Sequence, residues 1–187
     1  MFTTKKAEKI LNLVRREYST LYNELIFIEE GEEFSMFEMF DMATITIQGE
    51  MTDRKWVKWM YKYLNKNYNL DSNVYMFNNF IEVFAFIHEI GHLYYKDLTT
   101  PEEIKFDYKE YKERVYNSYE EAWKTYREIP NEKLADEFAV NFIKNNTIKI
   151  WSIMNEITEE KAKEEFEFWS DWSIKKVKCL LFFLFLL

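Results

Sequence analysis

Apolar residues recur along this chain mainly at the three- and four-residue spacing of a helix, and in two segments they follow the pattern of a strand. The first helical pattern runs over Thr4–Glu24, where apolar residues lie on one face and charged residues on the other. The β-branched segments Leu25–Glu29 and Ala43–Gln48 predict two strands. The intervening Phe34–Met42 is rich in methionine and phenylalanine, and its pattern assigns it to neither class.

The rest of the chain predicts helices joined by short connections. Val74–Phe77 is the exception, because it is a candidate for a short strand that leads into the next helix. Capping residues and prolines mark helix starts most clearly at Thr100-Pro101 and at Pro130. The expected helices run from Thr52 or Asp53 to about Asn65, over Phe80–Lys96, once or twice within Lys105–Glu128, over Pro130–Asn145 and onward from Thr158.

Length and composition favour a single domain of the α+β class. A chain of 187 residues can bury a hydrophobic core, and its 48% of hydrophobic residues exclude a disordered chain. Only three glycines and two prolines are present, so few sharp turns are available and long helices are favoured. We therefore expect one mainly helical domain over residues 1–187 with a small sheet, without internal repeats or a linker.

Charge and cysteine count narrow the functional classes. A net charge of −8 argues against a nucleic-acid-binding protein, so no direct contact with nucleic acid is expected. The single cysteine, Cys179, excludes a disulfide framework and a thiolate zinc cluster. The first residues, Met1–Lys9, are polar and charged, unlike a secretory signal, and we expect a cytoplasmic protein.

The C-terminal segment 158–187 is expected to form a helix that ends in the apolar run Cys179–Leu187. Its nine residues fall short of the roughly twenty that cross a bilayer, so no transmembrane span is expected. Burial in the core or in a groove of a partner protein is the preferred interpretation of this tail. Weak adsorption to a membrane, helped by Lys175, Lys176 and Lys178, is the alternative.

The segment His88–His92, which reads H-E-I-G-H, carries the clearest chemical signal in the chain. Positions four apart share a face of a helix, so both imidazoles point to the same place and form half of a tetrahedral zinc site. Glu89 would lie beside the metal rather than on it, where it can take a proton from water as a general base. Two histidines packed by chance are the competing interpretation, but these are the only two histidines of the chain, which favours a metal site.

A catalytic zinc usually has three protein ligands, so an acidic residue must complete the site. Glu132 and Asp136 are four apart on the helix after Pro130 and share a face. In this hypothesis Glu132 binds the metal, while Asp136 accepts a hydrogen bond from the far nitrogen of a ligand histidine.

The same helix offers Ala135 and Ala139, whose small size would allow a close approach to Gly91. An ordinary solvated acidic face is the alternative interpretation of this helix. The chain has 33 acidic residues, so Asp136, Glu137 and the acids of 102–128 remain open as ligands should Glu132 not be one.

The H-E-I-G-H segment followed by E-x-x-A-D-x-F-A at Glu132–Ala139 resembles the ImmA/IrrE family of zinc metallopeptidases over roughly residues 70–145. The chain departs from that family's pattern in a longer segment between the motifs and in Leu134, where the family commonly has a second acid. The resemblance implies a zinc-dependent endopeptidase of the gluzincin type. It assigns the zinc to His88, His92 and Glu132, the general base to Glu89, and the orientation of a ligand histidine to Asp136.

The same resemblance implies a protein substrate, typically a helix-turn-helix repressor encoded on the same phage or mobile element. An edge strand, either Ala43–Gln48 or Val74–Phe77, would hold this substrate as an added strand. Four tyrosines are unranked candidates for stabilising the oxyanion: Tyr94, Tyr95, Tyr108 and Tyr119. The alternative function is a non-catalytic protein that uses zinc for stability and inactivates a regulatory partner by binding it.

Overall fold

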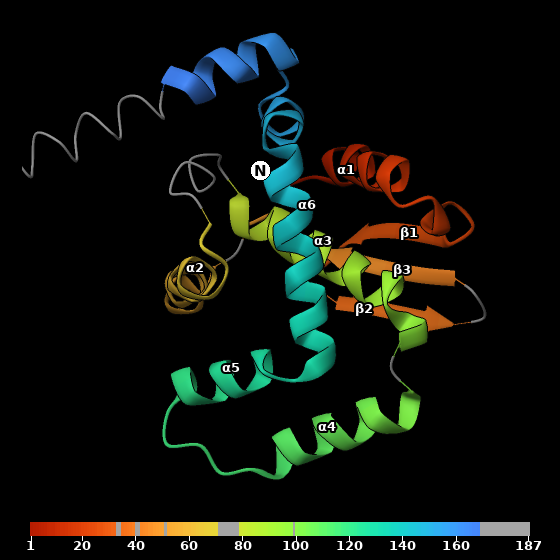
Figure 1. The fold of residues 1–187 in the computed structure, drawn as a ribbon, viewed down its shortest axis with the longest axis vertical. Coiled ribbons are helices and arrows are strands. Elements are labelled where there is room, and N and C mark those ends of the chain that lie inside the picture. Colours follow the sequence, from red (N-terminus) through yellow and green to blue (C-terminus); the bar gives the residue numbers. More distant parts are fainter. Residues whose placement is uncertain (33–34, 40–41, 51, 71–78, 99, 169–187) are drawn as a thin grey trace, which may run out of the picture.

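The computed structural model describes residues 1–32, 35–39, 42–50, 52–70, 79–98 and 100–168. Helices α3 (Phe80–Tyr94) and α6 (Pro130–Asn155) cross at the centre of the molecule, with a small sheet on one side and α2 (Arg54–Tyr68) on the other (Figure 1). The expected fold class, α+β and mainly helical with a small sheet, is confirmed.

Helix α1 (Thr4–Glu17) begins at the cap residue Thr3, whose side chain accepts a hydrogen bond from the backbone of Lys6. The prediction that this helix continues to Glu24 is wrong, because the chain leaves the α-helical path after Glu17 and forms the 3-10 helix η1 (Ser19–Tyr22). The Arg15 guanidinium stabilises this departure by donating to the carbonyl oxygens of Leu21 and Glu24, at 3.2 and 2.7 Å.

The sheet contains β1 (Leu25–Glu30), β2 (Ser35–Met39) and β3 (Met42–Ile47) in the order β1-β3-β2. β3 pairs parallel with β1 and antiparallel with β2, so the unassigned methionine-rich segment supplies a strand. The expectation that Ala43–Gln48 is an edge strand open to a substrate is therefore wrong, because β1 and β2 occupy both of its sides. The alternate residues Ala43, Ile45 and Ile47 are buried.

Helix α2 begins after Asp53, whose carboxylate accepts hydrogen bonds from the backbone of Lys55 and Trp56. It ends at Tyr68, three residues beyond the expected Asn65, with Asn69 in the left-handed conformation at φ 46°. Val74–Phe77, the candidate strand after it, lies outside the described residues.

Helices α3 and α6 form the centre of the core, and almost every residue of α3 is buried. They approach closely at Gly91, where an added Cβ would lie 3.0 Å from the Cα of Ala135. This contact confirms the predicted role of small residues at the crossing. Helix α6 continues ten residues beyond the predicted end at Asn145, but Asn146 interrupts it with non-helical backbone angles (φ −123°, ψ 17°).

A short 3-10 helix, η3 (Lys96–Leu98), connects α3 to α4 (Pro101–Glu113), and α5 (Tyr119–Arg127) follows. A capping box between Thr100 and Glu103 fixes the start of α4, as its sequence predicted. Figure 1 shows α4 and α5 together at the end of the molecule where α6 begins. A last helix over 159–168 begins as expected, and the apolar tail Cys179–Leu187 lies outside the described residues. None of the described helices combines the length and apolar character that crossing a bilayer requires.

Candidate metal centre

The two histidines of α3 lie with their rings side by side, as their spacing predicted. The ring centroids of His88 and His92 are 4.6 Å apart, and their Nε2 atoms are separated by 3.1 Å. His88 is buried and His92 is half-buried, so both nitrogens face a point inside the fold rather than open solvent. Two imidazoles presented in this way are suited to a shared metal ion.

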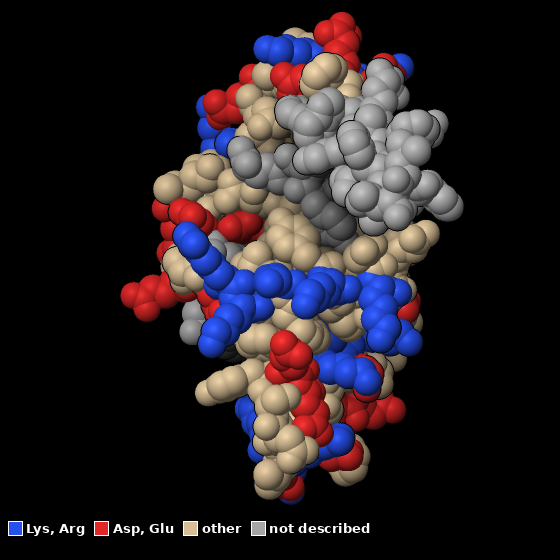
Figure 2. Space-filling view, turned by 90° about the vertical axis from the view of Figure 1, so that its left-hand side faces the viewer, with Lys and Arg blue, Asp and Glu red and all other residues tan. Residues whose placement is uncertain are grey.

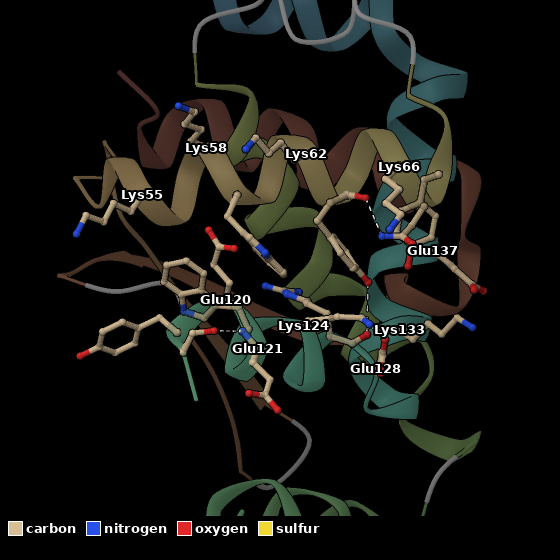
Figure 3. Close-up of a pocket in the computed structure, with 18 of the residues that line it drawn as sticks. Lys55, Lys58, Lys62, Lys66, Glu120, Glu121, Lys124, Glu128, Lys133 and Glu137 are labelled. Carbon is tan, nitrogen blue, oxygen red and sulfur yellow. Dashed lines mark hydrogen bonds and ion pairs between the residues drawn. The ribbon is translucent and has the colours of Figure 1, made fainter. Parts of the chain in front are cut away.

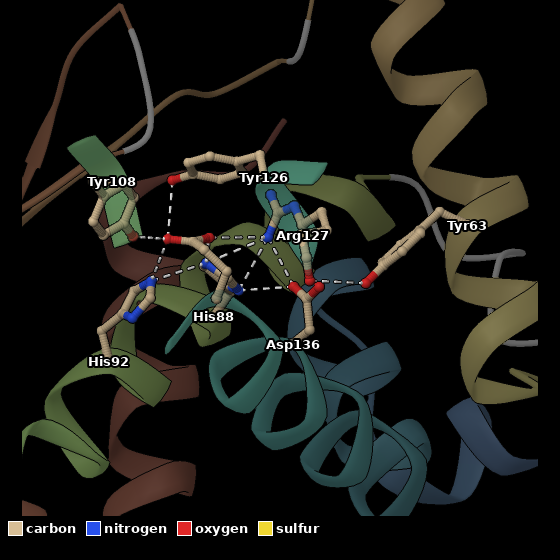
Figure 4. A network of polar contacts seen from close by, with 8 residues as sticks. Tyr63, His88, His92, Tyr108, Tyr126, Arg127 and Asp136 are labelled. Atoms are coloured by element: carbon tan, nitrogen blue, oxygen red, sulfur yellow. Dashed lines mark hydrogen bonds and ion pairs between the residues drawn. The ribbon is translucent and has the colours of Figure 1, made fainter. Parts of the chain in front are cut away.

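Figure 4 shows His88 and His92 in one polar cluster with Arg127 and Asp136. Glu132, on the first turn of α6, brings its carboxylate to the two histidines. Its Oε2 atom lies 3.1 Å from His88 Nε2, and its Oε1 atom lies 3.4 Å from His92 Nε2. A tetrahedral zinc with bonds near 2.0–2.1 Å separates its ligand atoms by about 3.3 Å. His88, His92 and Glu132 therefore form a group that could hold a metal ion, and their distances fit one with short bonds.

Asp136 lies one turn further along α6, at the far side of the His88 ring. Its Oδ1 atom is 2.9 Å from His88 Nδ1, as the sequence-based hypothesis expected. A hydrogen bond from Nδ1 leaves the lone pair of Nε2 for a metal, so Asp136 sets both the tautomer and the orientation of His88. Among the described residues, Asp136 Oδ2 and His92 Nδ1 are buried without a hydrogen-bond partner.

Arg127, the last residue of α5, is a member of this cluster that sequence reasoning did not identify. Its Nη1 atom donates to Asp136 Oδ1 at 2.8 Å and lies 3.6 Å from Glu132 Oε2. The same atom is 3.3 and 3.4 Å from the two ring nitrogens of His88, and this near-equal spacing places it against the ring face rather than along either lone pair. Arg127 thus joins His88, Asp136 and Glu132 in one polar cluster.

Arg127 remains charged in this half-buried position. Burial by itself would lower the pKa of the guanidinium, but the carboxylates of Asp136 and Glu132 outweigh burial and raise that pKa. Its positive charge offsets part of the negative charge of the two acids. The group formed by Glu132, Asp136 and Arg127 therefore carries a net charge of about −1, which a divalent cation would more than neutralise.

Two tyrosines donate hydrogen bonds to the Oε1 atom of Glu132. The hydroxyl of Tyr126 donates to Glu132 Oε1 at 2.9 Å, and the hydroxyl of Tyr108 on α4 donates to the same atom. Burial, followed by the charge of Glu132, raises the pKa of both tyrosines, so both remain hydrogen-bond donors. Burial opposes ionisation of Glu132 as well, but its hydrogen bonds with His88 and His92 outweigh this and hold the pKa of Glu132 well below its usual value.

Of the four tyrosines considered for the oxyanion, the structure brings only Tyr108 into contact with this cluster. Tyr94 and Tyr95 pack against Phe138 instead, and Tyr119 is 81% exposed on α5. Tyr126 was not among the candidates, although its hydroxyl reaches the same carboxylate oxygen.

Glu89 follows His88 on α3 and is half-buried. Among the residues that the structure describes, its side chain forms no hydrogen bond or ion pair. The carboxylate is therefore not committed to a structural contact in the described part of the chain. This leaves it available for the proton transfer that its position in the motif predicts.

Protonation of His88 makes metal binding depend on pH. Burial and the charge of Arg127 both lower the pKa of His88, but hydrogen bonds with Asp136 and Glu132 outweigh them and raise it to about 9. Without a metal, this bound proton stabilises the folded state fully below the ordinary pKa of 6.5, and the stabilisation is lost as the pH rises to about 9. A metal needs the neutral imidazole, so metal and proton compete for His88.

We expect the apparent metal affinity to rise by up to about tenfold per pH unit between pH 6.5 and about 9, because His88 must release a proton. Competition with a chelating dye over this range measures the slope. Calorimetry in two buffers of different ionisation enthalpy counts the released protons. A flat affinity profile together with a proton count near zero would contradict this account of His88.

Comparisons of the chain with models of protein families, with curated proteins and with solved structures gave no match. The resemblance to a peptidase family therefore rests on the two sequence motifs. The arrangement of the side chains carries the functional argument from here on.

Proposed function

We propose that this protein is a zinc-dependent endopeptidase that cleaves a protein substrate. The observation that carries the proposal is the convergence of His88, His92 and Glu132, with Asp136 behind His88. Two imidazoles and one carboxylate suit zinc, whereas calcium and magnesium prefer oxygen ligands. The half-buried Glu89 beside this group supplies the general base that hydrolysis needs.

A zinc ion held by His88, His92 and Glu132 would supply a Lewis acid for the peptide carbonyl and would lower the pKa of a bound water to about 7. Glu89 takes the proton of the attacking water and passes it to the nitrogen of the leaving amine. Asp136 holds His88 in one tautomer and one orientation. The hydroxyls of Tyr108 and Tyr126 donate to Glu132 Oε1, so they orient the carboxylate that would be the third ligand.

The motif resemblance extends the proposal to the substrate. A helix-turn-helix repressor of a phage or mobile element is the substrate that the resemblance implies. Such a repressor encoded in a neighbouring gene is the first protein to test.

The test incubates the zinc-loaded protein with that repressor, with and without 1,10-phenanthroline, and follows cleavage by mass spectrometry. We expect zinc-dependent cleavage at a defined peptide bond, abolished by the chelator and restored by added zinc. Replacing His92 by alanine should abolish cleavage, while replacing the exposed Glu8 of α1 by glutamine should not. Cleavage that survives both the chelator and the loss of His92 would refute a zinc peptidase.

One observation favours the alternative of a non-catalytic, zinc-stabilised protein that binds and inactivates a regulatory partner. Tyr108, Tyr126 and Arg127 all contact Glu132, so the carboxylate has protein partners on both oxygens. Such a closed cluster also suits a structural role. Retained zinc, no cleavage of a co-encoded protein, and a full biological effect of Glu89→Gln would together support this alternative.

A further inference from the structure

A groove of about 1450 Å³ lies between α2, α5 and α6, beside the metal centre (Figure 3). One wall carries four lysines of α2, namely Lys55, Lys58, Lys62 and Lys66, and we call it the lysine groove. Figure 2 shows a band of basic side chains across this face of the molecule. The band is unexpected on a chain whose net charge is −8.

The basic charge is concentrated in α2 itself. Its sequence, RKWVKWMYKYLNKNY, contains five basic residues and no acidic one. The four lysines are spaced by three, four and four residues, so they share one face of the helix. Like charges at these spacings repel one another, and Lys55 additionally opposes the helix dipole in the first turn. The row therefore weakens α2 unless an anion lies against it.

No anion within the described part of the chain meets this need. None of the four lysine ammonium groups forms an ion pair with a described carboxylate, and all four side chains are exposed. On the α5 wall, by contrast, Glu121 accepts hydrogen bonds from Asn117, and Glu128 lies 3.7 Å from Lys124. Among the described side chains that line the groove, those left without a partner are thus mainly positively charged.

Aromatic side chains lie between the two walls. Trp59 of α2 stacks on Tyr63 at 5.2 Å between ring centroids and contacts Trp123 of α5 at 5.6 Å. All three line the groove and are half-buried. They give a ligand an apolar surface next to the lysine row.

The spacing of the lysines fits an extended polypeptide. Four helical residues advance about 6 Å, and alternate residues of an extended strand advance about 6.6 Å on one face. The whole row spans about 16 Å, the length of about five extended residues. We propose that the lysine groove binds an extended acidic segment of the protein substrate, with acidic side chains at alternate positions facing α2 and apolar side chains facing Trp123.

A nucleic acid also carries regularly spaced negative charge, but the opposite wall disfavours it. Glu120, Glu121 and Glu128 line the α5 side of the groove (Figure 3). Phosphates along a strand would meet these carboxylates as well as the lysines. A peptide can present acidic residues on one side only, and therefore matches both walls.

One side chain, Arg127, belongs both to the groove and to the metal centre. Arg127 lines the groove and also contacts His88 and Asp136, and the hydroxyl of Tyr63 donates to the Arg127 carbonyl oxygen at 3.5 Å. An acidic segment held in the groove would be anchored next to the metal centre without occupying it. The identity of this segment as part of a substrate rests on the proposed function, whereas its binding to the groove does not.

The test measures fluorescence anisotropy with a labelled peptide of about eight residues that alternates Glu and Leu, and with a counterpart that alternates Lys and Leu. The protein is the full chain loaded with zinc and carrying Glu89→Gln, so that no probe is cleaved. We expect the acidic peptide to bind more tightly than the basic one, and more weakly at higher salt. Lys58→Glu combined with Lys62→Glu should weaken binding of the acidic peptide at least about tenfold. Lys58→Gln combined with Lys62→Gln should weaken it by a smaller factor.

A matched control reverses Lys5 and Lys9, which are four apart and exposed on α1, away from the groove, and should leave binding unchanged. Circular dichroism and zinc stoichiometry check that each variant is folded. Equal binding of acidic and basic peptides, an equal effect of the control reversal, or tighter binding of a labelled single-stranded oligonucleotide would each overturn the inference. If the groove binds the acidic peptide but the unmodified protein does not cleave the proposed protein substrate, the proposed function is refuted and the groove inference stands. If that substrate is cleaved equally well after Lys58→Glu and Lys62→Glu, the groove inference is refuted and the proposed function stands.

Discussion

Replacing Glu132 by alanine is expected to cause a larger loss of zinc affinity than replacing either of the other two carboxylates of the candidate metal centre, Glu89 and Asp136. The substitution removes the only acidic side chain among the described residues that faces both histidine Nε2 atoms, at 3.1 and 3.4 Å. It also leaves the hydroxyls of Tyr108 and Tyr126 without their acceptor. Metal analysis after dialysis, and competition with a chelating dye, should show stoichiometry falling from about one zinc per chain toward zero.

Two companion variants separate ligation from folding. Glu132→Gln keeps the size of the side chain and an oxygen for the tyrosine hydroxyls, but removes the charge, so it should fold better than alanine and still bind zinc weakly. Asp136→Ala removes the partner of His88 Nδ1 and should cost about 10–100-fold in affinity, less than the loss of a direct ligand. If Glu132→Ala binds zinc as the unmodified protein does, the third ligand is another acid, with Asp136, Glu137 and the acids of 102–128 to be tested.

The histidine–glutamate pairing was predictable because it follows from helical spacing. His88 and His92 share a face at four residues apart, and so do Glu132 and Asp136. Small residues at Gly91 and Ala135 then indicated where the two helices could touch, and the structure places them in contact. Local periodicity and side-chain size were sufficient for this part of the site.

Arg127 and Tyr126 were not predictable in the same way. They reach the cluster because α4 and α5 lie beside the start of α6. No spacing of residues in the sequence indicates that position. The chain has 25 lysines and arginines and 13 tyrosines, so residue type alone could not select these two. Tertiary packing decides which cation lies beside the two acids, and the sequence pattern does not show that packing.

Long-range pairing explains the errors in the sheet as well. The methionine- and phenylalanine-rich segment has no clear alternation, yet Ser35–Met39 becomes a strand because β3 pairs with it. That same pairing turns β3 from an expected edge into the central strand. The length of α1 was overestimated because the Arg15 contacts that stabilise η1 join residues on the two sides of a turn. Such contacts produce no periodic pattern in the sequence.

The lysine groove shows how a summed charge can hide a local one. The net charge of −8 correctly reflects 33 acidic against 25 basic residues. It does not show that α2 carries five basic residues and no acid. Charge counted helix by helix, rather than over the whole chain, makes the row visible in the amino-acid sequence alone.

Glu89→Gln is expected to abolish peptide hydrolysis while zinc stays bound. The amide keeps the size of the side chain but cannot accept the proton of water, so the rate should fall by about 10²–10⁴-fold, the range of a lost general base. Among the described residues Glu89 has no structural partner, and neither fold stability nor zinc stoichiometry should change. Single-turnover cleavage of the substrate under test, metal analysis and thermal unfolding measure the three quantities.

The matched control is Glu8→Gln, which makes the same chemical change at an exposed position of α1. It should leave all three measurements as they are in the unmodified protein. A Glu89→Gln protein that still cleaves at the original rate would exclude Glu89 as the base. One that loses zinc together with activity would mean that Glu89 supports the metal centre itself, since proton transfer alone has no effect on metal affinity.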